Sequence, residues 1–200
     1  MEGSPGSTTY YSTDPIASGP KFADVTDPNS YYYKPVKWAV EHGITNGVSE
    51  TSFGVNRACT RAQVVTFLYR AAQDQSISED LNLSFNDVSA SAWYYDAVRW
   101  AVDKGITTGT SGISFSPNQP CTRAQAVTFL WRAAKLDPNY QPPTGEELSF
   151  TDVPAAAYYR EAVLWALQNG ITTGTSAASF SPNSIVSRAQ MVTFLWRYMK

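Results

Sequence analysis

Three arginines stand at the start of three closely similar segments of this 200-residue chain. Each segment opens with a hydroxyl residue, Arg, Ala and Gln and continues into an apolar run; the arginines are Arg61, Arg123 and Arg188. A hydroxyl residue followed by Gln three positions later is the capping-box pattern, which predicts that a helix begins at each arginine. An arginine in a first turn is unusual, because the positive end of the helix macrodipole disfavours a cation there.

Two interpretations of these helix-start arginines are open. In the first, each side chain reaches out to water or pairs with a nearby carboxylate and has no role in binding. In the second, the free amides of a helix N-terminus and the fork of the guanidinium together bind an anion. The same exception made in three segments favours the anion site.

The apolar run after each arginine predicts a buried helix. In the first segment Val64, Phe67, Leu68 and Ala71 follow the i, i+3, i+4, i+7 spacing of one helix face. Further apolar residues widen that face until little of the helix is polar, which is typical of a helix buried on most sides. Three such helices predict a shared central bundle.

Each of these helices closes a longer repeat. A Phe-x-Asp-Val motif opens the repeat, and an aromatic cluster and a short helix containing Trp-Ala follow it. A glycine then stands where a left-handed C-cap belongs, within a Gly-Ile-Thr-x-Gly motif. The stretch before the second helix predicts a tight loop with at most a short strand or hairpin. We number the repeats 1 (residues 22–72), 2 (85–134) and 3 (150–200).

Two helices cannot bury their apolar faces alone, so the three repeats are expected to share one core. We predict one all-α domain over residues 21–200, made of three helix-loop-helix repeats closed around a pseudo-threefold axis. The second helices would form the central three-helix bundle, and the loops and short strands would form prongs around it. Residues 1–20, rich in Ser, Thr, Gly and Pro, predict a flexible tail or a leader added to the chain.

Composition excludes several classes of function. The formal net charge is −2 and 16% of residues are charged, which is unlike the basic footprint of a nucleic-acid binder. No stretch of about 18 apolar residues predicts a membrane span, and no signal peptide is recognisable in these residues. With one histidine, His42, and two cysteines, no usual zinc set and no cofactor site is expected.

The two cysteines, Cys59 and Cys121, occupy one position of successive repeats, and Val186 occupies it in the third. Replacement by valine predicts small buried side chains just before each second helix. A disulfide between the cysteines is the alternative.

The order of the motifs resembles the S-layer homology repeat in all three copies, over roughly residues 22–200. The resemblance implies a bacterial cell-surface anchoring domain of three repeats, whose grooves between prongs bind a secondary cell-wall polysaccharide. In that family the polymer typically ends in a pyruvylated amino sugar. The family's arginine matches the three helix-start arginines, and its acidic position matches Asp24, Asp87 and Asp152. The family's usual Glu is replaced here by Gln63, Gln125 and Gln190.

The resemblance gives these residues expected roles. A pyruvyl ketal carries a carboxylate, which an arginine fork can bind. The aspartates would accept hydrogen bonds from sugar hydroxyls or an acetamido N–H, or else cap the first helix or pair with the arginine. Trp38, Trp100 and Trp165 stand seven positions after Tyr31, Trp93 and Tyr158, on one stripe of the first helix. These tryptophans would contact the sugar or, alternatively, serve in packing.

The sequence predicts a binding module and no catalytic residue. Carboxylate pairs can hydrolyse glycosides, but three similar sites differ from the single asymmetric site usual in an enzyme. We therefore expect an extracellular anchor on the wall of a Gram-positive cell, with at least two competent grooves and an unidentified cargo module. The alternative is a scaffold for protein association in a surface layer, without glycan binding.

Overall fold

The computed structural model describes residues 22–145 and 147–200, so the tail predicted for residues 1–20 lies outside the described residues. The described part is mostly helical and has no sheet, only isolated bridges within and between loops. The all-α class is therefore confirmed. Its six helices are α1 (Tyr33–Glu41), α2 (Arg61–Ala71), α3 (Tyr95–Asp103), α4 (Arg123–Ala134), α5 (Arg160–Gln168) and α6 (Arg188–Tyr198).

The predicted capping boxes are present at the starts of α2, α4 and α6. In α2 the Thr60 hydroxyl accepts from the Gln63 amide at 3.3 Å, and the Gln63 side chain accepts from the Thr60 amide at 3.1 Å. Glutamine thus replaces glutamate without loss of the box. The C-cap glycines are also confirmed: Gly43, which follows α1, has a φ of 68°.

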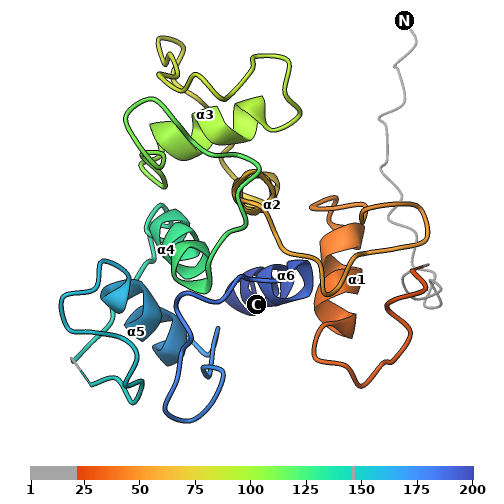
Figure 1. Cartoon of the computed structure of the whole chain (residues 1–200), viewed down its shortest axis with the longest axis vertical. Coiled ribbons are helices and arrows are strands. Elements are labelled where there is room, and N and C mark those ends of the chain that lie inside the picture. Colours follow the sequence, from red (N-terminus) through yellow and green to blue (C-terminus); the bar gives the residue numbers. More distant parts are fainter. Residues whose placement is uncertain (1–21, 146) are drawn as a thin grey trace, which may run out of the picture.

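The second helices of the repeats, α2, α4 and α6, each contact the other two and lie at the centre of the molecule (Figure 1). The first helices lie outside them, and each packs on a second helix from a different repeat. Helix α3 packs on α2, α5 on α4, and α1 on α6. The contact between α1 and α6 joins the first and last helices, so no repeat buries its apolar surface by itself.

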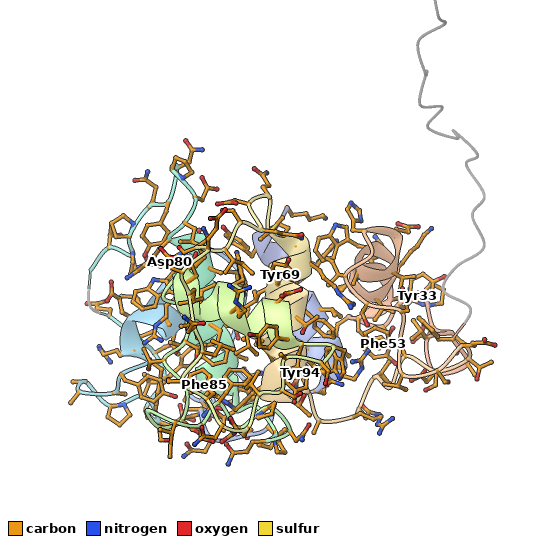
Figure 2. The ribbon with its side chains drawn as sticks, turned by 90° about the horizontal axis from the view of Figure 1, so that it is seen from above. Tyr33, Phe53, Tyr69, Asp80, Phe85 and Tyr94 are labelled. Carbon is orange, nitrogen blue, oxygen red and sulfur yellow. The ribbon has the colours of Figure 1, made fainter. Side chains whose placement is uncertain are left out.

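Seen from the side, the central bundle has two distinct ends (Figure 2). Phe85 and Tyr94 lie towards the end where α2 begins, and Tyr69 and Asp80 lie towards the other. Tyr69 packs against Trp100 of α3, with ring centroids 5.7 Å apart. No helix in residues 22–145 and 147–200 is long and apolar enough to cross a membrane.

Three backbone hydrogen bonds join the repeats just before the central helices. The Cys59 amide donates to Val186, the Val186 amide to Cys121, and the Cys121 amide to Cys59, each at 2.9 Å. Both cysteines are buried and free, so the alternative of a disulfide is wrong and the prediction of small buried side chains is confirmed. Burial raises the pKa of Cys121 to about 12 and that of Cys59 further, so both thiols stay protonated.

Candidate functional site

Each helix-start arginine reaches from its own repeat into the next. Arg61 Nε of repeat 1 donates to the carbonyl of Phe115 in repeat 2 at 2.9 Å. Its guanidinium carbon lies 4.9 Å from the centre of the Phe115 ring and 5.2 Å from that of Phe129. The same contacts run from repeat 2 to repeat 3 (Arg123 to Phe180) and from repeat 3 back to repeat 1 (Arg188 to Phe53).

The three arginines are buried, with 2%, 4% and 3% of their surface exposed in chain order. None forms a salt bridge among the described residues. Both parts of the first interpretation, the side chain in water and the side chain paired with a carboxylate, are therefore wrong. Burial lowers the pKa of each guanidinium, and the phenylalanine rings and carbonyls take the place of water around it.

The helix N-termini themselves are occupied by protein. At α4 the Arg123 amide donates to Ser184 at 2.8 Å and the Ala124 amide to Pro182 at 3.0 Å. The third amide, of Gln125, donates to the hydroxyl of Thr122. Helices α2 and α6 repeat this pattern. The prediction that free amides offer an anion site is therefore wrong, and only the guanidinium remains for a ligand.

Two of the guanidinium groups retain an unpartnered nitrogen. Nη2 of Arg61 and Nη2 of Arg123 are buried and have no hydrogen-bond acceptor among the described residues. Such a group costs about 1–3 kcal/mol when left unsatisfied. In the third copy, Arg188 Nη2 donates to the hydroxyl of Thr45 at 3.1 Å. The three arginines thus make the same contacts with the next repeat, but only Arg61 and Arg123 keep a buried Nη2 donor without an acceptor among the described residues.

The aspartates hold the loops that receive the arginines. Asp152 accepts from the amides of Phe180 at 2.8 Å and Ser181 at 2.7 Å, and from the hydroxyl of Ser179 at 2.6 Å. Asp24 and Asp87 hold the corresponding loops of repeats 1 and 2 in the same way. Each aspartate therefore fixes the phenylalanine whose carbonyl the arginine of the preceding repeat contacts.

The structure brings each aspartate near an arginine of another repeat. Asp152 interacts electrostatically with Arg123, Asp87 with Arg61 and Asp24 with Arg188, without forming salt bridges. The aspartates do not cap the first helices either, whose N-caps carry no side-chain hydrogen bond. The two structural alternatives considered from the sequence are thus replaced by a third, in which the aspartate positions a loop.

We expect Asp152→Asn to lower the free energy of unfolding by about 1–2 kcal/mol, because an amide nitrogen would face the Ser181 amide. Burial disfavours the charged carboxylate, but the hydrogen bonds from Ser179, Phe180 and Ser181 outweigh it, so the pKa lies below its ordinary 3.8. The carboxylate therefore stabilises the fold fully above about pH 4, and this contribution is lost as the pH falls through the lowered pKa. Urea unfolding between pH 3 and 7 measures both effects, with Asp80→Asn as an exposed control. Equal losses in the two variants would contradict the assigned role.

Two of the three predicted tryptophans lie inside the core. Trp100 and Trp165 are 1% and 2% exposed, and Trp100 Nε1 donates to the carbonyl of Asp74 at 3.0 Å. Trp38 is partly buried and packs beside His42, whose side chain is exposed. The packing alternative accounts for Trp100 and Trp165, and their contact with a ligand stays a prediction. The proposal below does not depend on them.

Three other aromatic side chains at one position of the repeat are exposed. Tyr31, Trp93 and Tyr158 are 54%, 62% and 63% exposed. Tyr31 of repeat 1 interacts electrostatically with Arg123, and Tyr158 of repeat 3 with Arg61, in each case an arginine of another repeat. Sequence reasoning had noted these residues but had assigned the ligand contact to the tryptophans that follow them. We call Tyr31, Trp93 and Tyr158 the groove aromatics.

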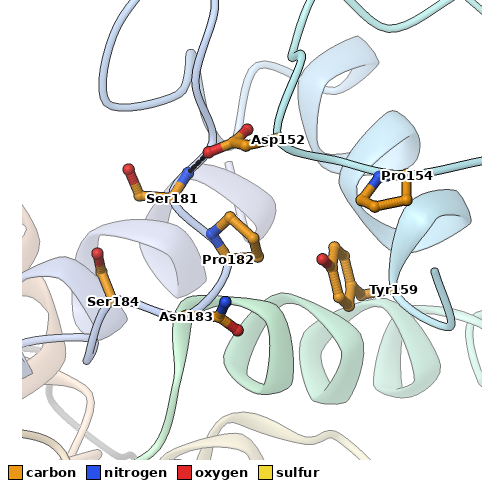
Figure 3. Close-up of a pocket in the computed structure, with 7 residues that line it drawn as sticks. All are labelled: Asp152, Pro154, Tyr159, Ser181, Pro182, Asn183 and Ser184. Carbon is orange, nitrogen blue, oxygen red and sulfur yellow. Dashed lines mark hydrogen bonds between the residues drawn. The ribbon is translucent and has the colours of Figure 1, made fainter.

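A cavity of about 420 Å³ lies beside the start of α4 (Figure 3). Its wall includes Asp152, Tyr159 and the loop from Ser181 to Ser184. The carbonyl of Ser184 accepts from the Arg123 amide, which places this loop directly against the helix start. A volume of this size is in the range of small-molecule sites. The described residues contain no group of three His, Cys, Asp or Glu side chains that could hold a metal ion.

Comparison with known proteins identifies the family of the three repeats. The family model for the S-layer homology domain matches residues 21–65, 84–127 and 149–192. A cell surface protein of Thermoanaerobacter kivui is 32% identical over 121 residues, which cover 59% of this chain and 16% of that protein. An S-layer protein of Bacillus thuringiensis subsp. finitimus is 28% identical over 181 residues, 90% of this chain and 21% of its own. An endoglucanase of Bacillus sp. strain KSM-635 is 28% identical over 131 residues, 66% of this chain and 13% of its own.

The chain thus spans about a fifth or less of the length of these curated relatives. The three matched segments together cover more than half of its residues and coincide with the three repeats. The chain therefore belongs to the S-layer homology domain family.

Proposed function

We propose that this chain is a non-catalytic module that anchors a protein to the bacterial cell surface by binding an acidic secondary polysaccharide of the wall. The observation that carries the proposal is the buried guanidinium of Arg61 and of Arg123, whose Nη2 has no hydrogen-bond acceptor among the described residues. An exposed aromatic ring of another repeat interacts electrostatically with each guanidinium and forms a pair with it. The pair is formed by Tyr158 with Arg61 and by Tyr31 with Arg123. We further propose that the repeats close around a pseudo-threefold axis, which gives three grooves, one at each helix-start arginine.

The chemistry of the pair fits a sugar that carries a carboxylate, such as a pyruvyl ketal. The ring offers an apolar face to the C–H surface of the sugar, while a guanidinium donates charge-assisted hydrogen bonds to the carboxylate. The unpartnered Nη2 atoms of Arg61 and Arg123 support this, because a carboxylate would satisfy them. The aspartates would act by positioning the loop, since their oxygens already accept hydrogen bonds.

The family and its relatives support the coarser part of the proposal, an anchoring module at the cell surface or wall. Relatives named as a cell surface protein and an S-layer protein share the repeats, and so does a relative named as an endoglucanase. One module in proteins of such different names favours a role in attachment over catalysis. We propose, as part of the same function, that the whole protein is secreted and carries a cargo module.

Sedimentation of the chain with purified wall sacculi of a Gram-positive bacterium tests the proposal. We expect the chain to pellet with intact sacculi and to remain in the supernatant after acid extraction of the secondary polymer. Addition of the extracted polymer to intact sacculi should release it by competition. Equal binding before and after extraction would contradict polysaccharide recognition and favour a scaffold for protein association.

A further inference from the structure

The loop of repeat 1 that corresponds to the cavity wall of repeat 3 differs from the loops of the other two repeats. In that cavity Ser181 and Ser184 contribute to the wall. Gly54 and Arg57 take their places in repeat 1. The backbone keeps its path, because the carbonyl of Arg57 accepts from the Arg188 amide at 2.9 Å, as Ser184 does from Arg123. The replacement therefore changes the chemistry of the wall and not its position.

The side chain of Arg57 lies across this wall. A Cβ atom added at Gly54 would stand 2.9 Å from Arg57 Cδ and 3.3 Å from Arg57 Cγ. Glycine at this position, where φ is +77°, therefore leaves the space that the stem of Arg57 uses. The corresponding serines of the other repeats direct their hydroxyls to a neighbouring threonine, Ser116 to Thr110 at 2.7 Å and Ser181 to Thr175 at 2.6 Å.

Arg57 adds a second cation beside Arg188. It is exposed and has no carboxylate within ion-pair distance among the described residues. The Arg57 carbonyl accepts from the Arg188 amide, so the two residues are neighbours; burial chiefly lowers the pKa of Arg188, and the charge of Arg57 also lowers it. Asp24 is near, but its oxygens already accept four hydrogen bonds from its own loop.

Arg188 and Arg57 differ in burial and in the hydrogen-bond donors that they leave free. Arg188 is held by the Phe53 carbonyl and the Thr45 hydroxyl, so it supplies a fixed positive charge with few free donors. Arg57 supplies free donors at the surface. Repeats 2 and 3 carry Gln119 and Ser184 at this position, so neither has a second cation there.

We propose that Arg57 makes the groove of repeat 1 selective for a ligand with two anionic groups, a carboxylate and a phosphate on one sugar unit. The grooves of repeats 2 and 3 would take the singly charged sugar. This inference rests on the proposed function, because it assigns the ligand class of one groove of the same module. An exposed arginine without a carboxylate partner, beside a second buried cation, is a favourable receptor for phosphate.

An NMR titration resolves the grooves separately through the amides of Gly54, Ser116 and Ser181, which occupy one position of the three repeats. The probes are the methyl glycoside of a 4,6-O-pyruvylated N-acetylhexosamine, the same sugar phosphorylated at C1, and inorganic phosphate. We expect the phosphorylated sugar to shift the Gly54 amide at a roughly tenfold lower concentration than the amides of the two serines. The methyl glycoside should shift all three at similar concentrations.

Three variants test the assignment to Arg57. Arg57→Gln, which installs the residue of repeat 2, should abolish the preference at Gly54, and Arg57→Lys should retain most of it. Ser184→Arg combined with Ser181→Gly, which frees the space for the arginine stem, should confer the preference on the amide at position 181. Thermal unfolding checks that each variant is folded, and the exposed position makes large losses unexpected.

The outcomes separate this inference from the proposed function. If all three amides respond to both sugars at equal concentrations, or if Arg57→Gln changes nothing, the role of Arg57 is overturned and sugar binding stands. If no amide responds to either sugar, the proposed function fails for this ligand class. In that case an Arg57-dependent response of Gly54 to inorganic phosphate would support the anion site, and no such response would overturn it as well.

Discussion

Arg123→Ala is expected to lower the free energy of unfolding by about 3 kcal/mol, within the range for loss of a buried, hydrogen-bonded charge. The substitution removes the Nε hydrogen bond to the Phe180 carbonyl, which joins repeats 2 and 3. It also removes the packing of the guanidinium between the rings of Phe180 and Phe194. For a domain of this length, such a loss corresponds to a fall in melting temperature of about 6–12 °C.

Two controls give this measurement its meaning. Arg123→Lys keeps a positive charge but cannot reproduce the planar fork, so we expect it to lose most of the same stability. Lys34→Ala, at an exposed position of α1, should change the free energy of unfolding by less than about 0.5 kcal/mol. A loss below about 1 kcal/mol for Arg123→Ala would show that the arginine is not a structural link between repeats. Urea unfolding followed by tryptophan fluorescence measures all three variants.

The structural role of the arginines limits what their removal can show about binding. A triple alanine variant of the helix-start arginines would remove all three contacts between repeats and the charges of all three grooves together. Loss of wall binding by that variant would follow from unfolding as readily as from loss of the ligand contact. Binding is therefore better tested at side chains that the fold does not use.

The elements of the fold could be predicted from the sequence because their signals are local. A capping box, an i, i+3, i+4, i+7 face and a C-cap glycine each involve residues within two turns of helix. These patterns predicted where α2, α4 and α6 begin and that they form the core. The exchange of first helices between repeats, such as α1 on α6, could not be predicted in this way, because every repeat offers nearly the same partner surface.

The contacts of the site residues could not be predicted either, because they depend on which repeats lie next to each other. Arg61 was expected to use the free amides of its own helix start, but loops of repeat 2 occupy the amides of Arg61 and Ala62. Asp87 accepts from the loop amides of Phe115 and Ser116, which replaces the expected helix cap or ion pair, and its contact with a ligand stays a prediction. Both residue types were correctly singled out as important positions. Their partners lie in sequence-distant loops, for which a single sequence gives no pairing signal.

The tryptophans and the groove aromatics show the same limit on a smaller scale. Trp100 and Trp93 are seven positions apart and share one stripe of the sequence pattern. Helix α3 begins only at Tyr95, so Trp93 precedes the helix and is exposed. Trp100 lies within α3, and its buried side chain packs against Tyr69 of α2. The helical spacing was applied beyond the end of the helix, so the sequence pattern could not tell which member of the pair is exposed and which is buried.

The groove aromatics provide the sharpest test of binding. We expect a variant with Tyr31→Ser, Trp93→Ser and Tyr158→Ser to lose at least hundredfold in apparent affinity for wall sacculi. Each single change should cost roughly tenfold or less, because the remaining grooves still hold the polymer and the losses combine through multivalency. The melting temperature should change little, since the three side chains are mostly exposed. Sedimentation with a dilution series of sacculi measures the affinity.

A double variant with Leu136→Ser and Met199→Ser is the matched control, because it removes exposed apolar surface at the other end of the bundle. If the triple variant no longer binds the wall and the control still binds it, binding depends on the groove aromatics and not on nonspecific adsorption through exposed apolar side chains. If both retain it, the aromatic–arginine pairs are not the receptor, and the scaffold interpretation gains. If only the control releases it, contact with the wall lies at the end of the bundle where α2, α4 and α6 finish. Because the folded state survives in every arm, each result reports on the surface that the protein uses.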